Sequence, residues 1–259
     1  MSTSFLPGGF RFVPGMFQYS GGAAAEPGFA IERVRFHRPV PLAEGFKRIE
    51  AYITAAGRPM TSFCACELRS PAPFTDQGFI DFNRQYVGTL ERWGLFKNEV
   101  NPVARSNVCP EIDPPAGPSF HAFSFTRPAD KAPPTFVIAG SGEAQEGGAT
   151  YKERIVRYGE TSPDAMAAKA KHVHGEMERR MNVLGVSWPD CTATQIYTVH
   201  DIHHFLGEDI VRRGAARAGV TWHLCRPPVI GLEVLNTKRF KSRRPPKAIA
   251  IAMNHSPQR

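Results

Sequence analysis

Long apolar runs are missing from this 259-residue sequence, and none approaches the roughly 18 residues of a membrane span. The first seventeen residues contain two prolines and three glycines, and they lack the basic segment and apolar stretch of a secretory signal. We therefore expect a cytoplasmic protein with no membrane partner.

Cysteine is scarce, with five residues in the chain, an odd number. Cys64 and Cys66 are separated by one residue, which is not the C-x-x-C spacing of redox or zinc pairs. On a strand these two side chains would face the same side. We predict that all five are reduced and act as small buried hydrophobic residues.

Acidic residues are fewer than basic ones, 24 against 32, which gives a net charge of +8. Five of the basic residues lie within 238–244 and are followed by two prolines, so the excess is concentrated in a predicted basic tail, 238–259. This distribution argues against a nucleic acid partner, but it leaves a small anionic substrate possible.

Motifs for metals and cofactors are also absent. The histidines at 172, 174, 200, 203 and 204 do not form an H-E-x-x-H pattern, and no lysine follows Gly140-Ser141-Gly142 at phosphate-loop spacing. We expect no metal and no cofactor.

A repeated order of elements is the clearest positive signal. The proline-rich segment 127–134 reads as a linker, and the order β-α-β-α-β-β is predicted on each side of it. Gly57 and Gly185, each expected to end a helix, lie 128 residues apart. We predict a first domain, 1–126, and a second domain, 135–237.

The elements themselves follow from periodicity and capping signals. Ser162-Pro163 is a strong helix start, and the helix should run to Gly185. Predicted strands cover 16–22, 63–68, 104–108, 119–125, 135–144, 193–199, 216–222 and 229–235, and the other predicted helices cover 42–56, 78–93 and 205–213.

Arg105 and Arg217 each begin an R-x-x-V sequence, and sixteen residues further on lie His121 and Glu233. A guanidinium matches a carboxylate with two parallel hydrogen bonds, whereas a carboxylate or imidazole can move a proton. Two ordinary interpretations remain open: arginines on strands commonly form surface ion pairs, and His121, between Phe120 and Phe123, suits a half-buried structural histidine.

Four short stretches in this order resemble the YjgF/Rid (reactive-intermediate deaminase) family, in two fused copies. They are Phe79-Ile80-Asp81-Phe82-Asn83-Arg84-Gln85-Tyr86, Arg105-Ser106-Asn107-Val108, Arg217-Ala218-Gly219-Val220 and Gly231-Leu232-Glu233-Val234. The resemblance implies an α+β fold of two chorismate-mutase-like domains, each a mixed sheet with helices on one face. It also implies a homotrimer with six domain copies, or a multiple of it, and ligand clefts at domain boundaries.

The resemblance further implies roles for individual residues. Arg105 and Arg217 would bind the substrate carboxylate, and Glu233 would position a hydrolytic water. His121 stands in the place of this glutamate in the first copy. Tyr19 and Ser20 match a position that lines the cleft, and His200 ends a strand that could lead to it.

The function implied is hydrolytic deamination of an enamine or imine carboxylic acid. A fused chain of this length looks most like deaminases of 2-aminomuconate and its substituted relatives in aromatic degradation. The alternatives are a non-catalytic metabolite-binding protein and a chorismate-type lyase or hydrolase on the same fold. Release of ammonia would distinguish the deaminase from both.

Overall fold

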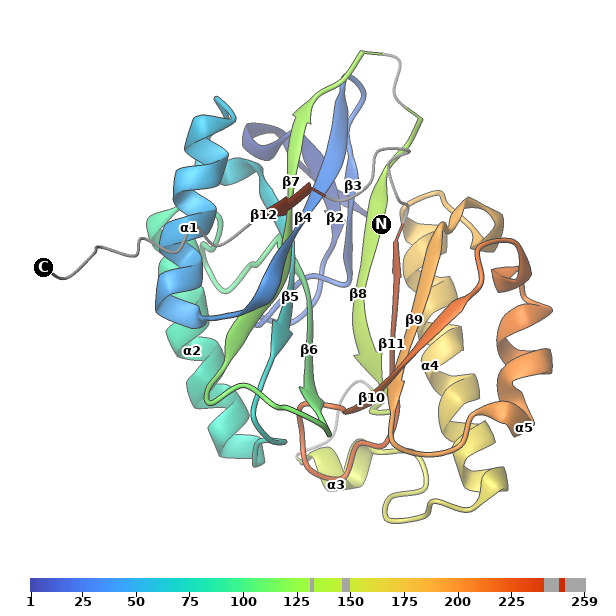
Figure 1. The fold of residues 1–259 in the computed structure, drawn as a ribbon. Coiled ribbons are helices and arrows are strands. Elements are labelled where there is room, and N and C mark those ends of the chain that lie inside the picture. The colour runs from blue at the N-terminus through green and yellow to red at the C-terminus, as the bar shows by residue number, and fades with distance from the viewer. Residues whose placement is uncertain (131–132, 146–149, 240–246, 250–259) are drawn as a thin grey trace, which may run out of the picture.

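The computed structural model describes residues 1–130, 133–145, 150–239 and 247–249. Its strands form one twelve-stranded mixed sheet, in the order β1-β2-β3-β8-β11-β9-β10-β6-β5-β7-β4-β12 (Figure 1). In chain order they are β1 (Thr3–Phe5), β2 (Phe10–Val13), β3 (Gly22–Ala25), β4 (Phe29–Pro41), β5 (Phe63–Arg69), β6 (Ala104–Pro110), β7 (Ser119–Pro128), β8 (Phe136–Gly142), β9 (Ala193–Thr198), β10 (Val220–Arg226), β11 (Leu235–Arg239) and β12 (Lys247–Ile249).

The helix after Ser162 starts at its predicted capping signal, whereas the helices predicted at 78–93 and 205–213 begin earlier, at 76 and 203. They are α1 (Leu42–Ala55), α2 (Asp76–Arg92), α3 (Tyr151–Arg154), α4 (Pro163–Val183) and α5 (His203–Leu206), the last continued by a π-helical turn, Gly207–Val211. The Ser162 hydroxyl accepts a hydrogen bond from the backbone N–H of Ala165 at the start of α4. After α1 and α4 the chain reverses at Gly57 and Gly185, with φ of 67° and 71°.

The two halves of the sheet repeat one connectivity. In the first, β5 pairs in parallel with β6 and antiparallel with β7, which pairs antiparallel with β4. In the second, β9 pairs in parallel with β10 and antiparallel with β11, which pairs antiparallel with β8. Strand β10 joins the halves by pairing antiparallel with β6. The prediction of an α+β fold with mixed strands is confirmed.

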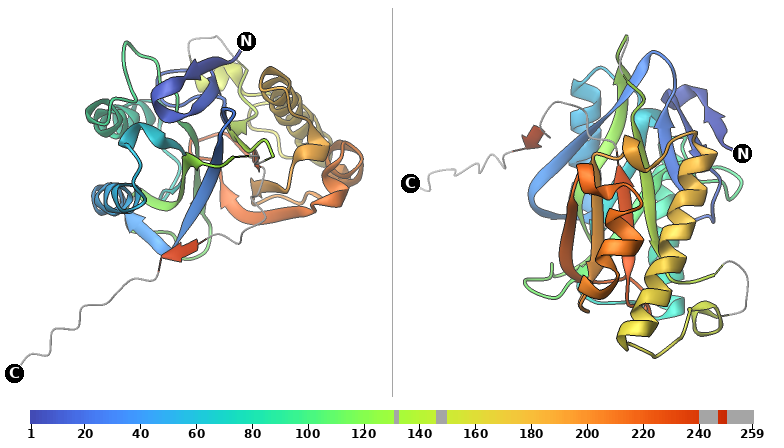
Figure 2. Two further views of the ribbon diagram at one scale, coloured as in Figure 1. Left: turned by 90° about the horizontal axis from the view of Figure 1, so that it is seen from above. Right: turned by 90° about the vertical axis from the view of Figure 1, so that its right-hand side faces the viewer.

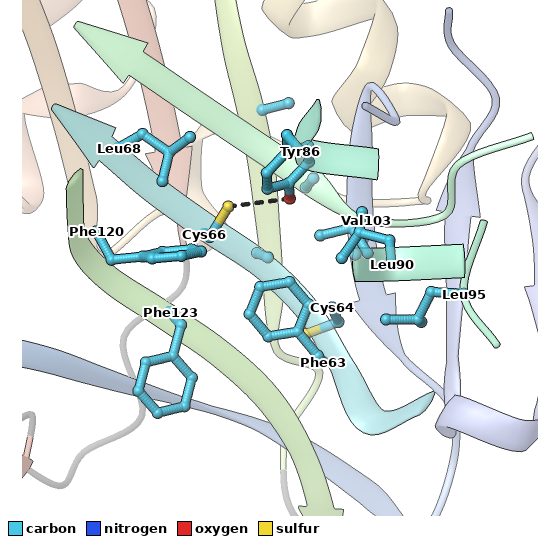
Figure 3. Close-up of a cluster of buried hydrophobic side chains, with 14 of the residues drawn as sticks. Phe63, Cys64, Cys66, Leu68, Tyr86, Leu90, Leu95, Val103, Phe120 and Phe123 are labelled. Atoms are coloured by element: carbon cyan, nitrogen blue, oxygen red, sulfur yellow. Dashed lines mark hydrogen bonds between the residues drawn. The ribbon is translucent and has the colours of Figure 1, made fainter. Parts of the chain in front are cut away.

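The helices cover the outside of this curled sheet. Figure 2 shows α1 and α2 on one side, α4 and α5 on the other, and the strands between them. In the first half, the core contains many aromatic rings, and Cys64 and Cys66 lie side by side on β5 within it (Figure 3). The Cys66 thiol is 3.3 Å from the Tyr86 hydroxyl, and burial raises the pKa of Cys66 to about 12. All five cysteines are buried and free, as predicted.

Three predicted strand positions are wrong. Residues 16–22 form mostly loop, and the equivalent strand is β4, which the prediction missed although buried Val34 and Phe36 alternate with exposed Arg35 and His37 in the period of a half-buried strand. β10 and β11 begin later than predicted, at 220 and 235, because Gly219 and Gly231 first turn the chain with φ of 74° and 90°.

The start of the predicted tail also differs, since β11 continues to Arg239 and the Lys238 side chain is 1% exposed. Residues 247–249 form β12 alongside β4, and the rest of the predicted tail, 240–246 and 250–259, lies outside the described residues. Among the helices that the structure describes, none is long and apolar enough to cross a membrane.

Candidate active site

A pocket of about 430 Å³ lies where the two halves of the chain meet. The first half contributes the loop between β2 and β3 and the start of α2, and the second contributes the end of β8, α3, α4 and the segment before β11. Its lining residues are Pro14, Gly15, Met16, Tyr19, Gly21, Phe79, Ser141, Gly142, Ala144, Gln145, Tyr151, Arg154, Arg179, Arg180, Pro228, Val229, Leu232 and Leu235.

The charged groups of this lining are all cationic. Arg154, Arg179 and Arg180 contribute guanidinium groups, and no described lining residue carries a carboxylate or an imidazole. Glu176 on α4 pairs with both Arg179 and Arg180, with nearest N–O distances of 2.7 and 2.6 Å. The pocket is therefore suited to an anion.

Arg105 lies directly behind the pocket wall. It is 2% exposed on β6, and its guanidinium carbon is 5.1 Å from the ring centre of Tyr19 and 5.9 Å from that of Phe79, both lining residues. Tyr86 and Phe82 surround it from the core side at 4.7 and 5.6 Å.

This buried guanidinium is only partly satisfied. Its Nη2 donates to Asn83 Oδ1 at 2.5 Å, whereas Nε and Nη1 have no hydrogen-bond partner among the described residues. No carboxylate among the described residues pairs with the Arg105 guanidinium. Because burying an unpaired cation is costly, Arg105 is held in a state that a bound carboxylate would complete.

A buried ion pair supports the part of the pocket wall that the second half of the chain contributes. Glu143 follows the end of β8, is completely buried, and lies 3.4 Å from the equally buried Lys169 ammonium on α4. Its carboxylate accepts the backbone N–H groups of Glu233 at 2.6 Å and Val234 at 3.3 Å. Burial raises the pKa of Glu143. The pair thus fastens the segment before β11 to β8 and α4.

Glu233 and His200 form a second pair beside this wall. His200 Nε2 lies 2.8 Å from Glu233 Oε2, and the Thr198 hydroxyl donates to the Glu233 carbonyl oxygen at 2.7 Å. Both side chains are partly exposed, at 26% and 19%. The structure therefore brings these two predicted residues together, although neither is among the lining residues.

The other predicted residues lie elsewhere. Ser20 is fully buried and donates to the Pro102 carbonyl oxygen at 3.0 Å. His121 on β7 lies near Arg69 and Glu67, outside the lining, and burial with the nearby Arg69 lowers its pKa to about 3. Arg217 is exposed in a short 3-10 helix, Ala215–Arg217, before β10.

Strand register separates Arg217 from the position that corresponds to Arg105. The 3-10 turns Met60–Ser62 and Trp188–Asp190 lie 128 residues apart, as do Gly57 and Gly185, so Cys66 on β5 corresponds to Thr194 on β9. Cys66 pairs with Arg105, and Thr194 pairs with Val220. The second copy thus has valine at the place of the buried arginine.

Sequence reasoning missed Arg154, Arg179, Arg180 and Tyr151. They come from α3 and α4, and they meet the first half of the chain only in the folded protein. Paired arginines in a helix are a common surface pattern, so no local signal distinguishes them. Groups of three or more potential metal ligands are not found within the described ranges.

A pocket of this size, with an arginine-rich rim and a partly apolar wall, is suited to a small anion. Residues 2–243 match the model of the family described as "2-aminomuconate deaminase CnbZ", and the chain belongs to this family of deaminases.

Individual proteins are also similar. The chain is 58% identical to 2-amino-5-chloromuconate deaminase of Comamonas testosteroni over 231 residues, which are 88% of this chain and 92% of that protein. Among solved structures, a chorismatase matches with a TM-score of 0.48 and 13% identity, over 88% of this chain and 79% of its own. A YjgF-family member from Mycobacterium tuberculosis matches with a TM-score of 0.30 and 19% identity, over 45% of this chain and 83% of its own.

Proposed function

We propose that the protein is a hydrolytic deaminase that releases ammonia from 2-aminomuconate, or a substituted 2-aminomuconate, during degradation of aromatic compounds. The observation that carries the proposal is a boundary pocket whose described lining has three arginines and no carboxylate, in a chain of the 2-aminomuconate deaminase family. The name of the relative from Comamonas testosteroni, 58% identical, supports the same substrate class.

The chemistry needs little from the protein. 2-Aminomuconate is a six-carbon diacid whose amino group sits on a carbon-carbon double bond, so a proton moving to carbon converts the enamine to an imine. Water then adds to the C=N carbon, and the resulting carbinolamine expels ammonia to leave a ketone. One C=N group and one water thus become one C=O group and one ammonia.

The pocket can bind and orient such a molecule. In our proposal the Tyr19 ring, which separates Arg105 from the pocket, moves aside, and Arg105 then binds the carboxylate next to the reacting carbon. The Ser141 hydroxyl and the Gln145 amide are neutral groups that could hold the attacking water. We also propose acid-base roles for Glu233 and His200, which form a hydrogen-bonded pair next to the wall residue Leu232.

The other three predicted residues, Ser20, His121 and Arg217, do not line the pocket. Ser20 supports the loop that carries Tyr19, since its hydroxyl is bound to backbone. His121 would contribute only from outside the described lining, as would Arg217.

Release of ammonia from 2-aminomuconate tests the function. We expect turnover above the spontaneous rate, and Arg105→Met should lower kcat/KM by about 100-fold, because a charge-assisted bidentate contact is lost. Arg38→Ala removes an exposed arginine on β4 outside the described lining, so it is the matched control and should change kcat/KM less than about twofold. Turnover at the spontaneous rate with folded wild-type protein would contradict the proposal.

We further propose a cytoplasmic homo-oligomer, either a trimer with six domain copies or a multiple of it. Light scattering of the purified chain would give the mass, and a monomer at micromolar concentration would contradict this assembly.

A further inference from the structure

We propose that the pocket recognises its substrate at both ends, with Arg105, reached once the Tyr19 ring moves aside, at an inner pole and Arg154, assisted by Arg180, at an outer pole. The pocket then selects planar dicarboxylates over monocarboxylates of the same shape. This inference rests on the proposed function for its substrate class, but the role of Arg154 and the binding test are separate from it.

The outer pole carries an excess of positive charge. Arg154 Nε donates to the Thr150 carbonyl oxygen at 3.3 Å, and its guanidinium lies 4.3 Å from the ring centre of Tyr151. Arg154 makes no ion pair with any described residue. Its charge therefore remains available to a carboxylate at the mouth of the pocket.

Arg180 is held rigidly at the same end. Its Nη1 donates to the carbonyl oxygens of Ala139 and Gly140 at 3.3 and 3.5 Å, and its Nε bonds Glu176. The side chain is only 12% exposed, so it is positioned before any ligand arrives. Arg179 takes part in the same pairing with Glu176.

Aromatic rings connect the two poles. The Arg105 guanidinium lies 5.9 Å from the Phe79 ring centre, Phe79 lies 6.5 Å from Tyr151, and Tyr151 lies 4.3 Å from the Arg154 guanidinium. Apolar wall residues Val229, Leu232 and Leu235 complete the middle. Flat apolar surface between two cationic ends is complementary to a flat conjugated chain between two carboxylates.

The two poles should contribute differently to affinity. The inner contact is shared by monoacids and diacids, so its loss weakens both. Only a diacid reaches Arg154, and one charge-assisted contact at a partly exposed site corresponds to about a 10- to 100-fold change in affinity.

Binding of two inert acids tests this without requiring turnover. Muconate and sorbate have the same six-carbon diene, but sorbate has a methyl group in place of one carboxylate. By calorimetry we expect wild-type protein to bind muconate at least about 10-fold more tightly than sorbate. Arg154→Ala should remove most of that preference and leave sorbate affinity within about twofold.

Lys152→Ala is the matched control, because Lys152 is an exposed cation on the same short helix that does not line the pocket. It should leave both affinities unchanged. Equal affinities for the two acids in wild-type protein, or an Arg154→Ala variant that still prefers muconate fully, would overturn the two-pole inference.

Turnover separates this inference from the proposed function. With 2-aminomuconate and the monoacid 2-iminopropanoate, Arg154→Ala should raise KM for the diacid alone. If wild-type protein binds muconate through Arg154 but releases no ammonia from either compound, the deaminase proposal fails and the two-pole inference stands.

Discussion

His174 is buried and His121 is partly buried, and both remain neutral in the folded protein because burial disfavours the charged imidazolium. His174 Nε2 lies 2.9 Å from the Asn236 amide nitrogen, which donates to it, and burial, followed by the nearby Lys238, lowers the pKa of His174 to about 3. Burial, followed by the nearby Arg69, lowers the pKa of His121 to about 3. Neither can take up a proton without losing these contacts.

This predicts loss of stability in mild acid. Below about pH 6.5 the unfolded chain binds protons at both histidines while the folded chain does not, so the unfolding free energy falls as the pH drops toward 3. Between pH 7.5 and 5.5 we expect urea unfolding to show a loss of about 1–3 kcal/mol.

His121→Gln should remove part of that pH dependence. His203→Gln is the control, since the His203 side chain is 75% exposed. A wild-type protein equally stable at both pH values would contradict the neutral state of the two histidines.

At the scale of elements, β11 presents polar groups to the core beneath α4. Lys238 Nζ has no hydrogen-bond partner among the described residues and lies 2.9 Å from the Trp188 ring centre. Burial lowers the pKa of Lys238 to about 7. Between about pH 7 and 10.5 the unfolded chain keeps this proton and the folded chain releases it, so stability should rise with pH across that window.

Lys238→Met should therefore stabilise the protein at pH 7, by about 1 kcal/mol after the lost contact with Trp188 is allowed for. It should also flatten the rise in stability toward pH 9.5. Thermal unfolding at both pH values checks this, and a variant less stable than wild type at pH 7 would show that the ammonium contact with Trp188 outweighs burial.

The Glu143–Lys169 pair links three elements, β8, α4 and the segment before β11. Glu143→Gln leaves a buried ammonium without its counter-charge, and Lys169→Met leaves a buried carboxylate, so each change should cost about 3 kcal/mol of unfolding free energy. The double variant should cost clearly less than the sum.

A double-mutant cycle by urea unfolding measures this coupling. Glu44→Gln provides the control, because its i,i+4 pair with Arg48 is exposed, so its loss should lower the unfolding free energy far less than either buried change. Additive effects of the two buried changes would contradict the supporting role of the pair.

The sequence predicts an element well when local residues determine its ends, and poorly when its position depends on pairing with distant strands. Local capping gives α1 and α4, since Ser162, Gly57 and Gly185 determine the ends of helices by themselves. The position of β11 depends instead on a glycine turn and on pairing with β8 and β9, which a local pattern does not contain.

The site divides in the same way. A motif resemblance identifies Arg105 and the neighbouring Tyr19, whereas the rim arginines are brought together only by tertiary structure. The prediction that Arg217 corresponds to Arg105 is wrong in strand register. The turn at Gly219 delays the start of β10, so Val220 and not Arg217 pairs with Thr194.

At the scale of the whole molecule, the repeated connectivity raises the question of how many sites one chain carries. The boundary pocket is built from the first copy's α2 and the second copy's β8 and α4, with Arg105 of the first copy behind it. If chains associate, the second copy's β10 would take the place of β6 at a boundary with another chain. Val220 there provides no cation to bind a carboxylate.

We therefore predict one high-affinity muconate site per chain. Calorimetric titration should give a stoichiometry near one, and Arg105→Met should abolish the transition, whereas Val220→Ala should leave both stoichiometry and affinity unchanged. Two equivalent sites per chain would show that a carboxylate is bound without an arginine at that strand position. The replacement of arginine by valine at position 220 would then not affect binding, and the arginines of the pocket rim would have to bind the carboxylate.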